Sequence, residues 1–102
     1  MAKRIVWTLQ AKDDRREILT YWFERTGNKK YSQKLAYQFR ETVKYIATHN
    51  YLGRSTDIEN VRVAISGNYL IFYRLSDELV EVVTVFDSRR NPQDLIIKDY
   101  SG

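Results

Sequence analysis

The first half of the chain places apolar residues at the spacing of α-helices. From Ala11 to about Arg25 they recur three and four positions apart, which predicts one helix over this range. The apolar members of this stripe are Ile18, Leu19, Trp22 and Phe23. Three acidic residues are expected in its first turns, where negative charge suits the helix dipole: Asp13, Asp14 and Glu17. Thr26-Gly27-Asn28 is expected to end the helix, because glycine can adopt the left-handed C-cap conformation.

A second helix is predicted after a short loop. Its apolar residues are four, four and three positions apart and form one continuous stripe: Leu35, Phe39, Val43 and Ile46. This helix is expected to end near His49-Asn50. Because the connection between the two helices is short, the pattern predicts an antiparallel helical hairpin. Trp7 and Trp22 are expected in the core beneath it.

The remaining elements have the pattern of β-strands. Residues 4–9 form a short β-type run, and after a loop over residues 51–60 three further runs occupy residues 61–66, 69–73 and 79–86. Side chains of the run 61–66 are expected to alternate between two faces, with Val61, Val63 and Ile65 on one and Arg62 and Ala64 on the other. The run 69–73 is apolar on both faces, as expected of a central strand.

Turn signals join these strands. Gly67-Asn68 has the tolerance for positive φ that a tight hairpin needs, and Ser76-Asp77-Glu78 forms the next turn. Asn91-Pro92 has the pattern of an N-cap followed by proline at the first helical position, which predicts a short helix through Ile96. The pattern alone predicts an α+β fold with helices packed on an antiparallel sheet.

Composition places the chain among single-domain globular proteins. Its 102 residues are expected to form one domain, with 43% hydrophobic and 29% charged residues. No apolar run approaches the roughly 18 residues of a membrane span, and Met1-Ala2-Lys3-Arg4 does not have the pattern of a signal peptide. With no cysteine and one histidine, neither disulfides nor a thiolate or histidine-based metal site is expected. We therefore expect a cytoplasmic protein without metal or cofactor.

Charge and catalytic motifs narrow the classes of function. The net charge is +4, and the first 50 residues hold 11 lysines and arginines against 5 acidic residues. A basic helical half favours an acidic partner, either a peptide or a nucleic acid. The chain has no glycine-rich phosphate loop, no paired carboxylate motif and no nucleophile triad order. Arginines and tyrosines remain, and metal-free RNA cleavage can use such groups, because arginine stabilises charge that develops on a phosphate.

One ordered pattern in the second half is more specific. Arg62 lies on the first strand of the predicted hairpin, Gly67-Asn68-Tyr69-Leu70-Ile71-Phe72-Tyr73-Arg74 forms its turn and second strand, and Phe86-Asp87-Ser88-Arg89-Arg90-Asn91-Pro92 follows the third. Together with the upstream helices, this pattern resembles the ParE and RelE group of toxins from bacterial type II toxin–antitoxin modules over nearly the whole chain. The resemblance implies the order β-α-α-β-β-β, with a helical hairpin packed on a small, mainly antiparallel sheet and a short C-terminal helix.

The RelE branch implies ribosome-dependent cleavage of mRNA. Its functional residues map onto Arg62 and onto Arg89 or Arg90, which would stabilise the phosphorane, with Tyr69 or Tyr100 as proton carrier. The match is partial. A leucine follows Tyr69 where that branch has arginine, and Tyr100 lies farther past Arg90 than the spacing of that branch.

The ParE branch shares this leucine, since its third strand typically reads Tyr-Leu-Ile-Phe-Tyr. The resemblance is closer to this branch, whose members poison DNA gyrase and are not nucleases. It implies a plasmid-stabilisation toxin that inhibits growth and is not itself an enzyme, with Arg62, Arg89 and Arg90 as target contacts. The alternatives are a ribosome-dependent mRNA endoribonuclease of RelE type and a non-toxic binding module.

A cognate antitoxin is the partner that the resemblance implies. We expect its disordered tail to fold on binding, with an amphipathic helix along an apolar groove and a strand added to the sheet edge. Its acidic residues are expected to complement Lys29, Lys30, Lys34 and Arg40. Operator DNA is expected to be bound only indirectly, through the antitoxin.

Each candidate site residue can instead have a purely structural role. Arg62 can pair with Glu81 across the sheet, and Arg89 and Arg90 can be loop charges or pair with Asp87. His49 is expected to be an end residue of the second helix rather than a general base.

Overall fold

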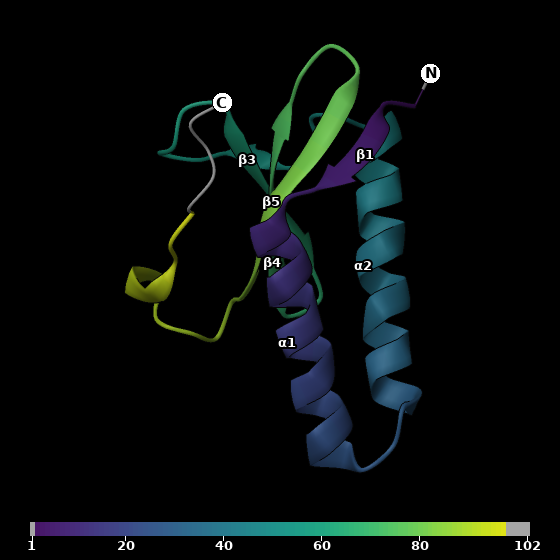
Figure 1. Ribbon diagram of the computed structural model, residues 1–102. Helices are drawn as coiled ribbons and strands as arrows, with labels where there is room; N and C mark the ends of the chain where they lie inside the picture. Colours follow the sequence, from purple (N-terminus) through teal and green to yellow (C-terminus); the bar gives the residue numbers. More distant parts are fainter. Residues whose placement is uncertain (1, 98–102) are drawn as a thin grey trace.

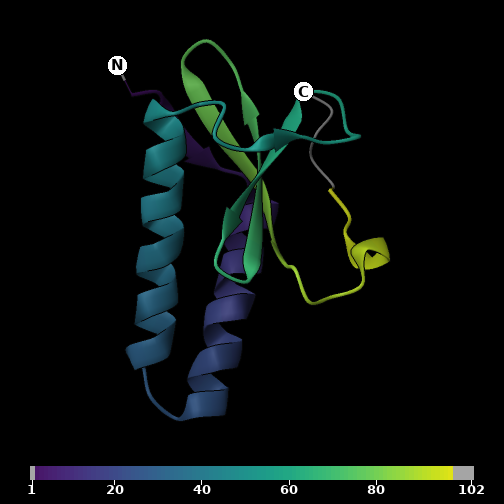
Figure 2. The same cartoon turned by 180° about the vertical axis from the view of Figure 1, so that it is seen from behind.

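Two helices form an antiparallel hairpin on one side of a five-stranded sheet. The computed structural model describes residues 2–97. Helix α1 spans Leu9–Thr26 and helix α2 spans Lys30–Thr48. The helices lie side by side, and the tip of their hairpin projects well beyond the end of the sheet (Figures 1 and 2). The predicted helical hairpin is confirmed. No helix among the described residues is both long and apolar enough to cross a membrane.

The ends of α1 follow from their capping residues. Thr8 Oγ1 accepts a hydrogen bond from the Ala11 N–H at 3.1 Å, so the helix begins at Leu9, two residues earlier than predicted. As a result, no acidic residue lies in the first turn of α1. The expected placement of Asp13, Asp14 and Glu17 in the first turns is therefore wrong for the first turn itself. The C-cap is Gly27 with φ of 75°, as predicted.

The sheet has the order β1-β5-β4-β3-β2. Its strands are β1 (Arg4–Trp7), β2 (Arg54–Ser55), β3 (Val61–Ser66), β4 (Tyr69–Leu75) and β5 (Leu79–Asp87). Only the β1–β5 pair is parallel, so the sheet is mainly antiparallel, and β4 is central as predicted. Strand β2 was not predicted, because two residues inside a loop carry no periodic pattern. The turn between β3 and β4 uses Gly67, whose φ of 61° is a backbone conformation that residues with side chains rarely adopt.

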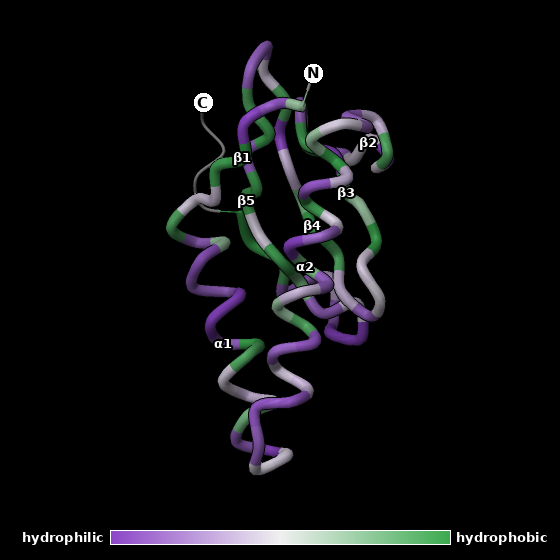
Figure 3. Tube along the Cα trace, turned by 90° about the vertical axis from the view of Figure 1, so that its right-hand side faces the viewer, coloured by the Kyte–Doolittle hydropathy of each residue, from purple (hydrophilic) through white to green (hydrophobic). Residues whose placement is uncertain are grey.

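The sheet buries apolar residues on both faces. The face toward the helices carries Ala64, Ile71 and Val82, which pack with Phe39 and Ile46 of α2, and Trp7 and Trp22 pack against this cluster partly buried. A smaller cluster on the opposite face contains Val61, Phe72, Val83, Phe86 and Ile97. Figure 3 shows hydrophobic residues concentrated in the strands and hydrophilic residues recurring along both helices. The predicted alternation in residues 61–66 is confirmed, since Val61 and Ala64 belong to different clusters.

Along the edge of β5 that faces β1, side chains replace a neighbouring strand as hydrogen-bond partners beyond Val82. Strand β1 pairs only with Leu79–Val82. Beyond that point Thr8 Oγ1 donates to the Val83 carbonyl at 3.1 Å, and Asp14 Oδ2 accepts from the Thr84 hydroxyl and the Val85 N–H. Asp14 therefore binds the open backbone of the strand, which no feature of the sequence indicated.

The C-terminal segment leaves the sheet through a sharp corner. Asn91 Oδ1 accepts a hydrogen bond from the Gln93 N–H at 3.0 Å and caps one turn of 3-10 helix, Pro92–Asp94. The predicted capping pattern is confirmed, but the helix is a single turn and does not reach Ile96. Ile97 then returns to the sheet and packs in the smaller cluster.

Candidate functional site

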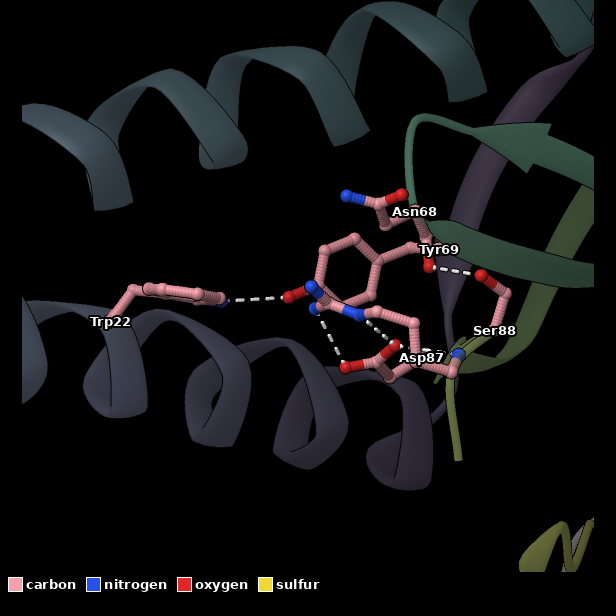
Figure 4. Close-up of polar contacts among 6 residues, drawn as sticks. Trp22, Asn68, Tyr69, Asp87 and Ser88 are labelled. Atoms are coloured by element: carbon pink, nitrogen blue, oxygen red, sulfur yellow. Dashed lines mark hydrogen bonds and ion pairs between the residues drawn. The ribbon is translucent and has the colours of Figure 1, made fainter. Parts of the chain in front are cut away.

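The candidate site lies where β5 ends and the chain turns toward the 3-10 turn. We call it the arginine corner and define it as Asp87, Ser88, Arg89 and Arg90. Figure 4 shows Asp87 and Ser88 of this corner beside Asn68, Tyr69 and Trp22. The Ser88 N–H and hydroxyl both donate to the Asn68 carbonyl, at 2.9 and 2.8 Å. These two bonds tie the corner to the β3–β4 turn, so the backbone of the corner is held by its neighbour in the sheet.

Arg89 is held in one orientation by Asp87. Arg89 Nε donates to Asp87 Oδ1 and Nη2 donates to Oδ2, both at 2.9 Å, and the Arg89 backbone N–H also donates to Oδ1 at 2.9 Å. This bidentate geometry is the strong form of an arginine–carboxylate pair. The guanidinium carbon lies 6.0 Å from the Trp22 ring centre and 5.9 Å from that of Tyr69. The side chain of Arg89 stays half exposed, so a fixed, oriented cation faces solvent.

The aromatic support of the corner is itself fixed by a hydrogen bond. Trp22 Nε1 donates to the Tyr69 hydroxyl oxygen at 2.8 Å and joins α1 to the start of β4 (Figure 4). The Tyr69 ring also meets Phe39 edge-on, with ring centres 5.2 Å apart. A shift of α1 against the sheet would therefore move Arg89.

The electrostatics of the corner follow from these contacts. The hydrogen bonds from Arg89 hold the pKa of Asp87 below its ordinary value, despite partial burial. Burial raises the pKa of Tyr69 above its ordinary value, although the hydrogen bond from Trp22 acts in the opposite direction. Tyr69 therefore remains protonated at neutral pH and is a poor general base there.

Arg90 and an acidic cleft lie beside the oriented cation. The Arg90 guanidinium carbon lies 5.0 Å from the Phe86 ring centre, and its Nη2 is 3.9 Å from Asp94 Oδ2. Next to it, a cleft of about 320 Å³ separates α1 from the end of β5. The cleft contains the carboxylates of Asp14 and Glu17, and burial raises the pKa of Asp14. The surface around the corner thus presents both signs of charge.

Arg62 lies at the other end of the sheet. It pairs in register with Tyr73, whereas the corner begins at Asp87, which pairs with Tyr69. Arg62 Nε and Nη2 donate to the Gly53 carbonyl at 3.1 and 2.5 Å, and its guanidinium lies over the Tyr51 ring. The structure therefore does not bring Arg62 together with the corner.

Of the ion pairs expected for Arg62 and Arg89, one is wrong and one is confirmed. The pairing of Arg62 with Glu81 is wrong, because Glu81 accepts from Arg74 on the neighbouring strand. The pairing of Arg89 with Asp87 is confirmed. Arg90 lies near Asp94 instead.

The remaining candidate residues lie apart from the corner. Lys29, Lys30 and Lys34 are exposed at the hairpin tip, and Arg40 is exposed farther along α2. Tyr100 lies outside the described residues. Residues 2–97 contain no group of three or more His, Cys, Asp or Glu side chains placed to hold a metal ion. His49 caps the C-terminal end of α2 and stacks on Tyr45, as expected of an end residue.

Comparison with known families decides the identity of this fold. The family described as the ParE toxin of the type II toxin-antitoxin system, parDE, matches residues 5–92. The chain belongs to the ParE toxin family. The matched range includes both helices, the arginine corner and all of the sheet except Arg4. No curated protein sequence matches the toxin.

Two solved structures show the same fold as this ParE-family toxin. One is a chromosomal ParDE toxin–antitoxin system from P. aeruginosa, with a TM-score of 0.74 and 17% identity over 84% of this chain and 96% of that chain. The other is the RelBE2 toxin–antitoxin complex from Mycobacterium tuberculosis, with a TM-score of 0.64 and 16% identity over 85% of this chain and 99% of that one. At these identities the likeness establishes the fold alone.

The Asp87–Arg89 pair of the toxin makes a testable contribution to its acid stability. A carboxyl whose pKa is lowered by folding stabilises the folded state above its ordinary pKa, here 3.8, and loses this contribution as pH falls through the lowered value. We expect the stability difference between the wild type and Asp87→Asn to be constant from neutral pH to about pH 5 and to shrink below pH 3.8. Urea midpoints measured from pH 7 to pH 2 test this, and parallel curves for the two proteins would contradict it.

Proposed function

We propose that this ParE-family chain arrests bacterial growth by acting on DNA gyrase, and that the arginine corner contacts the target. A cognate antitoxin, as in the ParDE and RelBE2 systems that share the fold, binds this chain and keeps it inactive. The proposal treats the protein as a binding protein and not as an enzyme. The observation that carries it is the fixed orientation of Arg89 between Asp87 and two aromatic rings.

Such an arrangement suits recognition better than proton transfer. A bidentate, ring-supported guanidinium is preorganised, so little side-chain entropy is lost when a partner binds it. Arginine and tryptophan are also the residue types that dominate binding energy at protein interfaces.

The RNA-cleavage alternative needs groups that converge on one phosphate. Arg62 lies at the opposite end of the sheet, and the raised pKa of Tyr69 keeps its proton in place. Cleavage requires a base for the 2′-OH proton and cations around the same phosphorane. Two separated arginines and a protonated tyrosine support a binding role instead.

Inducible expression tests the proposal with two measurements on the same cells. We expect growth arrest accompanied by DNA breaks and loss of negative supercoiling, and no codon-positioned cuts in abundant mRNAs by primer extension. Co-expression of the protein encoded beside this gene is expected to restore growth.

Two results would overturn parts of the proposal. Codon-positioned mRNA cuts without DNA damage would replace gyrase by the ribosome as the target. Normal growth at a verified level of soluble protein would make the chain a non-toxic binding module.

A further inference from the structure

The cleft beside the arginine corner combines apolar and aromatic walls with carboxylates. Its volume is about 320 Å³, at the lower end for sites that bind small groups. Ile18 and Val85 contribute aliphatic surface. The rings of Tyr21 and Trp22 meet edge-on with their centres 5.1 Å apart, and Tyr21 is 52% exposed. The cleft therefore offers ring surface to a planar group that enters from solvent.

The wall of this cleft carries more negative than positive charge. It contains three carboxylates, those of Asp14, Glu17 and Asp87, and one guanidinium, that of Arg90. Asp87 is paired with Arg89, and Arg90 lies 3.9 Å from a carboxylate of the 3-10 turn, outside the cleft. The negative charge that remains in the cleft belongs to the two carboxylates of α1.

No cation of the chain neutralises these two carboxylates. The residues three and four positions from Glu17 on the helix are two aspartates, a threonine and a tyrosine. No ion pair joins Asp14 or Glu17 to another residue within residues 2–97. Burial and the charges of Glu17 and Asp13 raise the pKa of Asp14, and hydrogen bonds from β5 oppose this only in part. A cation that enters the cleft would therefore find two unpaired carboxylates.

The Tyr69 hydroxyl adds an unused hydrogen-bond donor to the wall. Its oxygen accepts from Trp22 Nε1 at 2.8 Å, where the two side chains meet between α1 and β4 (Figure 4). Its own proton is donated to no other residue within 2–97, although Tyr69 is only 2% exposed. Buried polar groups normally have all their partners, so this donor indicates a ligand that carries an acceptor beside its cation. A basic side chain with its own peptide carbonyl has both.

The charge of the cleft selects the class of partner. Asp14 and Glu17 would repel the phosphates of a nucleic acid, and they match poorly with the acidic antitoxin that a basic chain of net charge +4 is expected to bind. A basic residue of the target protein fits. Arginine suits the cleft better than lysine, because its planar guanidinium both stacks on aromatic rings and pairs with two acceptors at once.

We propose that the cleft between α1 and the end of β5 binds an arginine side chain of the target protein, while Arg89 contacts an acidic group beside it. This inference rests on the proposed function for the identity of the target, and it adds the chemistry that the toxin recognises there. The toxin then selects a surface on which an arginine lies close to an acidic residue.

A pair of small probes tests the cleft without the target. N-acetylarginine N-methylamide carries the guanidinium and the carbonyl, and N-acetylcitrulline N-methylamide has the same shape without the charge. In NMR titrations at matched ionic strength we expect the arginine probe to bind with a dissociation constant of about 1 mM, and the citrulline probe at least about tenfold more weakly. The indole N–H signal of Trp22 should shift, whereas that of Trp7, which lies outside the cleft, should not.

A matched pair of charge reversals locates the binding. Glu17→Lys reverses an exposed carboxylate of the cleft, and Glu24→Lys makes the same change seven residues along the same helix, outside the cleft. Both side chains are exposed, so the fold is expected to persist. We expect Glu17→Lys to weaken the arginine probe at least about fivefold and Glu24→Lys to change its affinity by less than about twofold.

The same variants test the contact with the target. In the inhibition of DNA supercoiling by purified gyrase, half-maximal inhibition by Glu17→Lys should need at least about tenfold more toxin than inhibition by the wild type. Glu24→Lys should stay within about twofold of the wild type.

The outcomes separate this inference from the function on which it rests. A wild type without effect on gyrase overturns the proposed function, and the probe titrations still decide whether the cleft binds arginine. Equal binding of the two probes, or equal losses in the two variants, overturns the cleft as an arginine site. Full inhibition of gyrase by Glu17→Lys overturns it as a target contact. Loss of binding to the antitoxin in Glu17→Lys alone, with gyrase inhibition unchanged, would assign the cleft to the antitoxin instead.

Discussion

Replacing Arg89 and Arg90 together by alanine is expected to abolish growth arrest. The change removes the oriented guanidinium that Asp87 and two aromatic rings hold at the surface, and the second cation beside it. A central arginine of a protein interface is worth roughly 2 kcal/mol or more, so the pair should lower target affinity by at least about 100-fold. Colony counts after induction over a range of expression levels measure the effect.

The same variant should keep its fold, because both side chains are about half exposed and lie outside the core clusters. A matched control is Arg16→Ala with Arg25→Ala, which removes two exposed arginines of α1 that also contact neighbours on their own helix. We expect this control to arrest growth like the wild type. A corner variant that is as toxic as the control would show that the target contacts another surface.

Replacing Phe39 by alanine is expected to remove a large part of the stability of the fold. Phe39 is fully buried on α2 and packs against the Tyr69 ring. Phenylalanine-to-alanine changes in a core cost about 3–5 kcal/mol, and a domain of this size has only about 5–15 kcal/mol in total. Urea unfolding followed by tryptophan fluorescence measures the loss.

Tyr37→Ala provides the control on the same helix, because Tyr37 is an aromatic residue that is 57% exposed. We expect it to change the free energy of unfolding by no more than about 0.5 kcal/mol. Similar losses in the two variants would mean that α2 does not pack on the sheet through Phe39.

Most of the fold could be predicted from the chain because its periodicities are strong. The stripe through Leu35, Phe39 and Ile46 specifies α2, and the doubly apolar run of β4 specifies a central strand. Strand β2 was missed because two residues cannot show a period. The early start of α1 was missed because Thr8 acts as N-cap while it also bonds to β5, and the second contact is tertiary.

The candidate site was harder to predict because its parts are distant in sequence. The Arg-Arg-Asn-Pro corner was recognised, but Trp22 was assigned only to the core, and nothing local indicates that its N–H meets Tyr69. A buried indole N–H needs a partner, yet the sequence offers many hydroxyls. The position of Arg62 depends on strand register, since Arg62 and Tyr69 lie at opposite ends of the β3–β4 hairpin.

The parallel pairing of the first strand with the last has a consequence for protein synthesis. Residues 4–7 leave the ribosome well before their partners at residues 79–82, so β1 cannot join the sheet until residue 82 has been made. Long-range pairings of this kind form late, after the helical hairpin and the β3–β4–β5 meander have local contacts to guide them. A nascent or truncated chain that stops before residue 79 would therefore leave β1 without the strand with which it pairs.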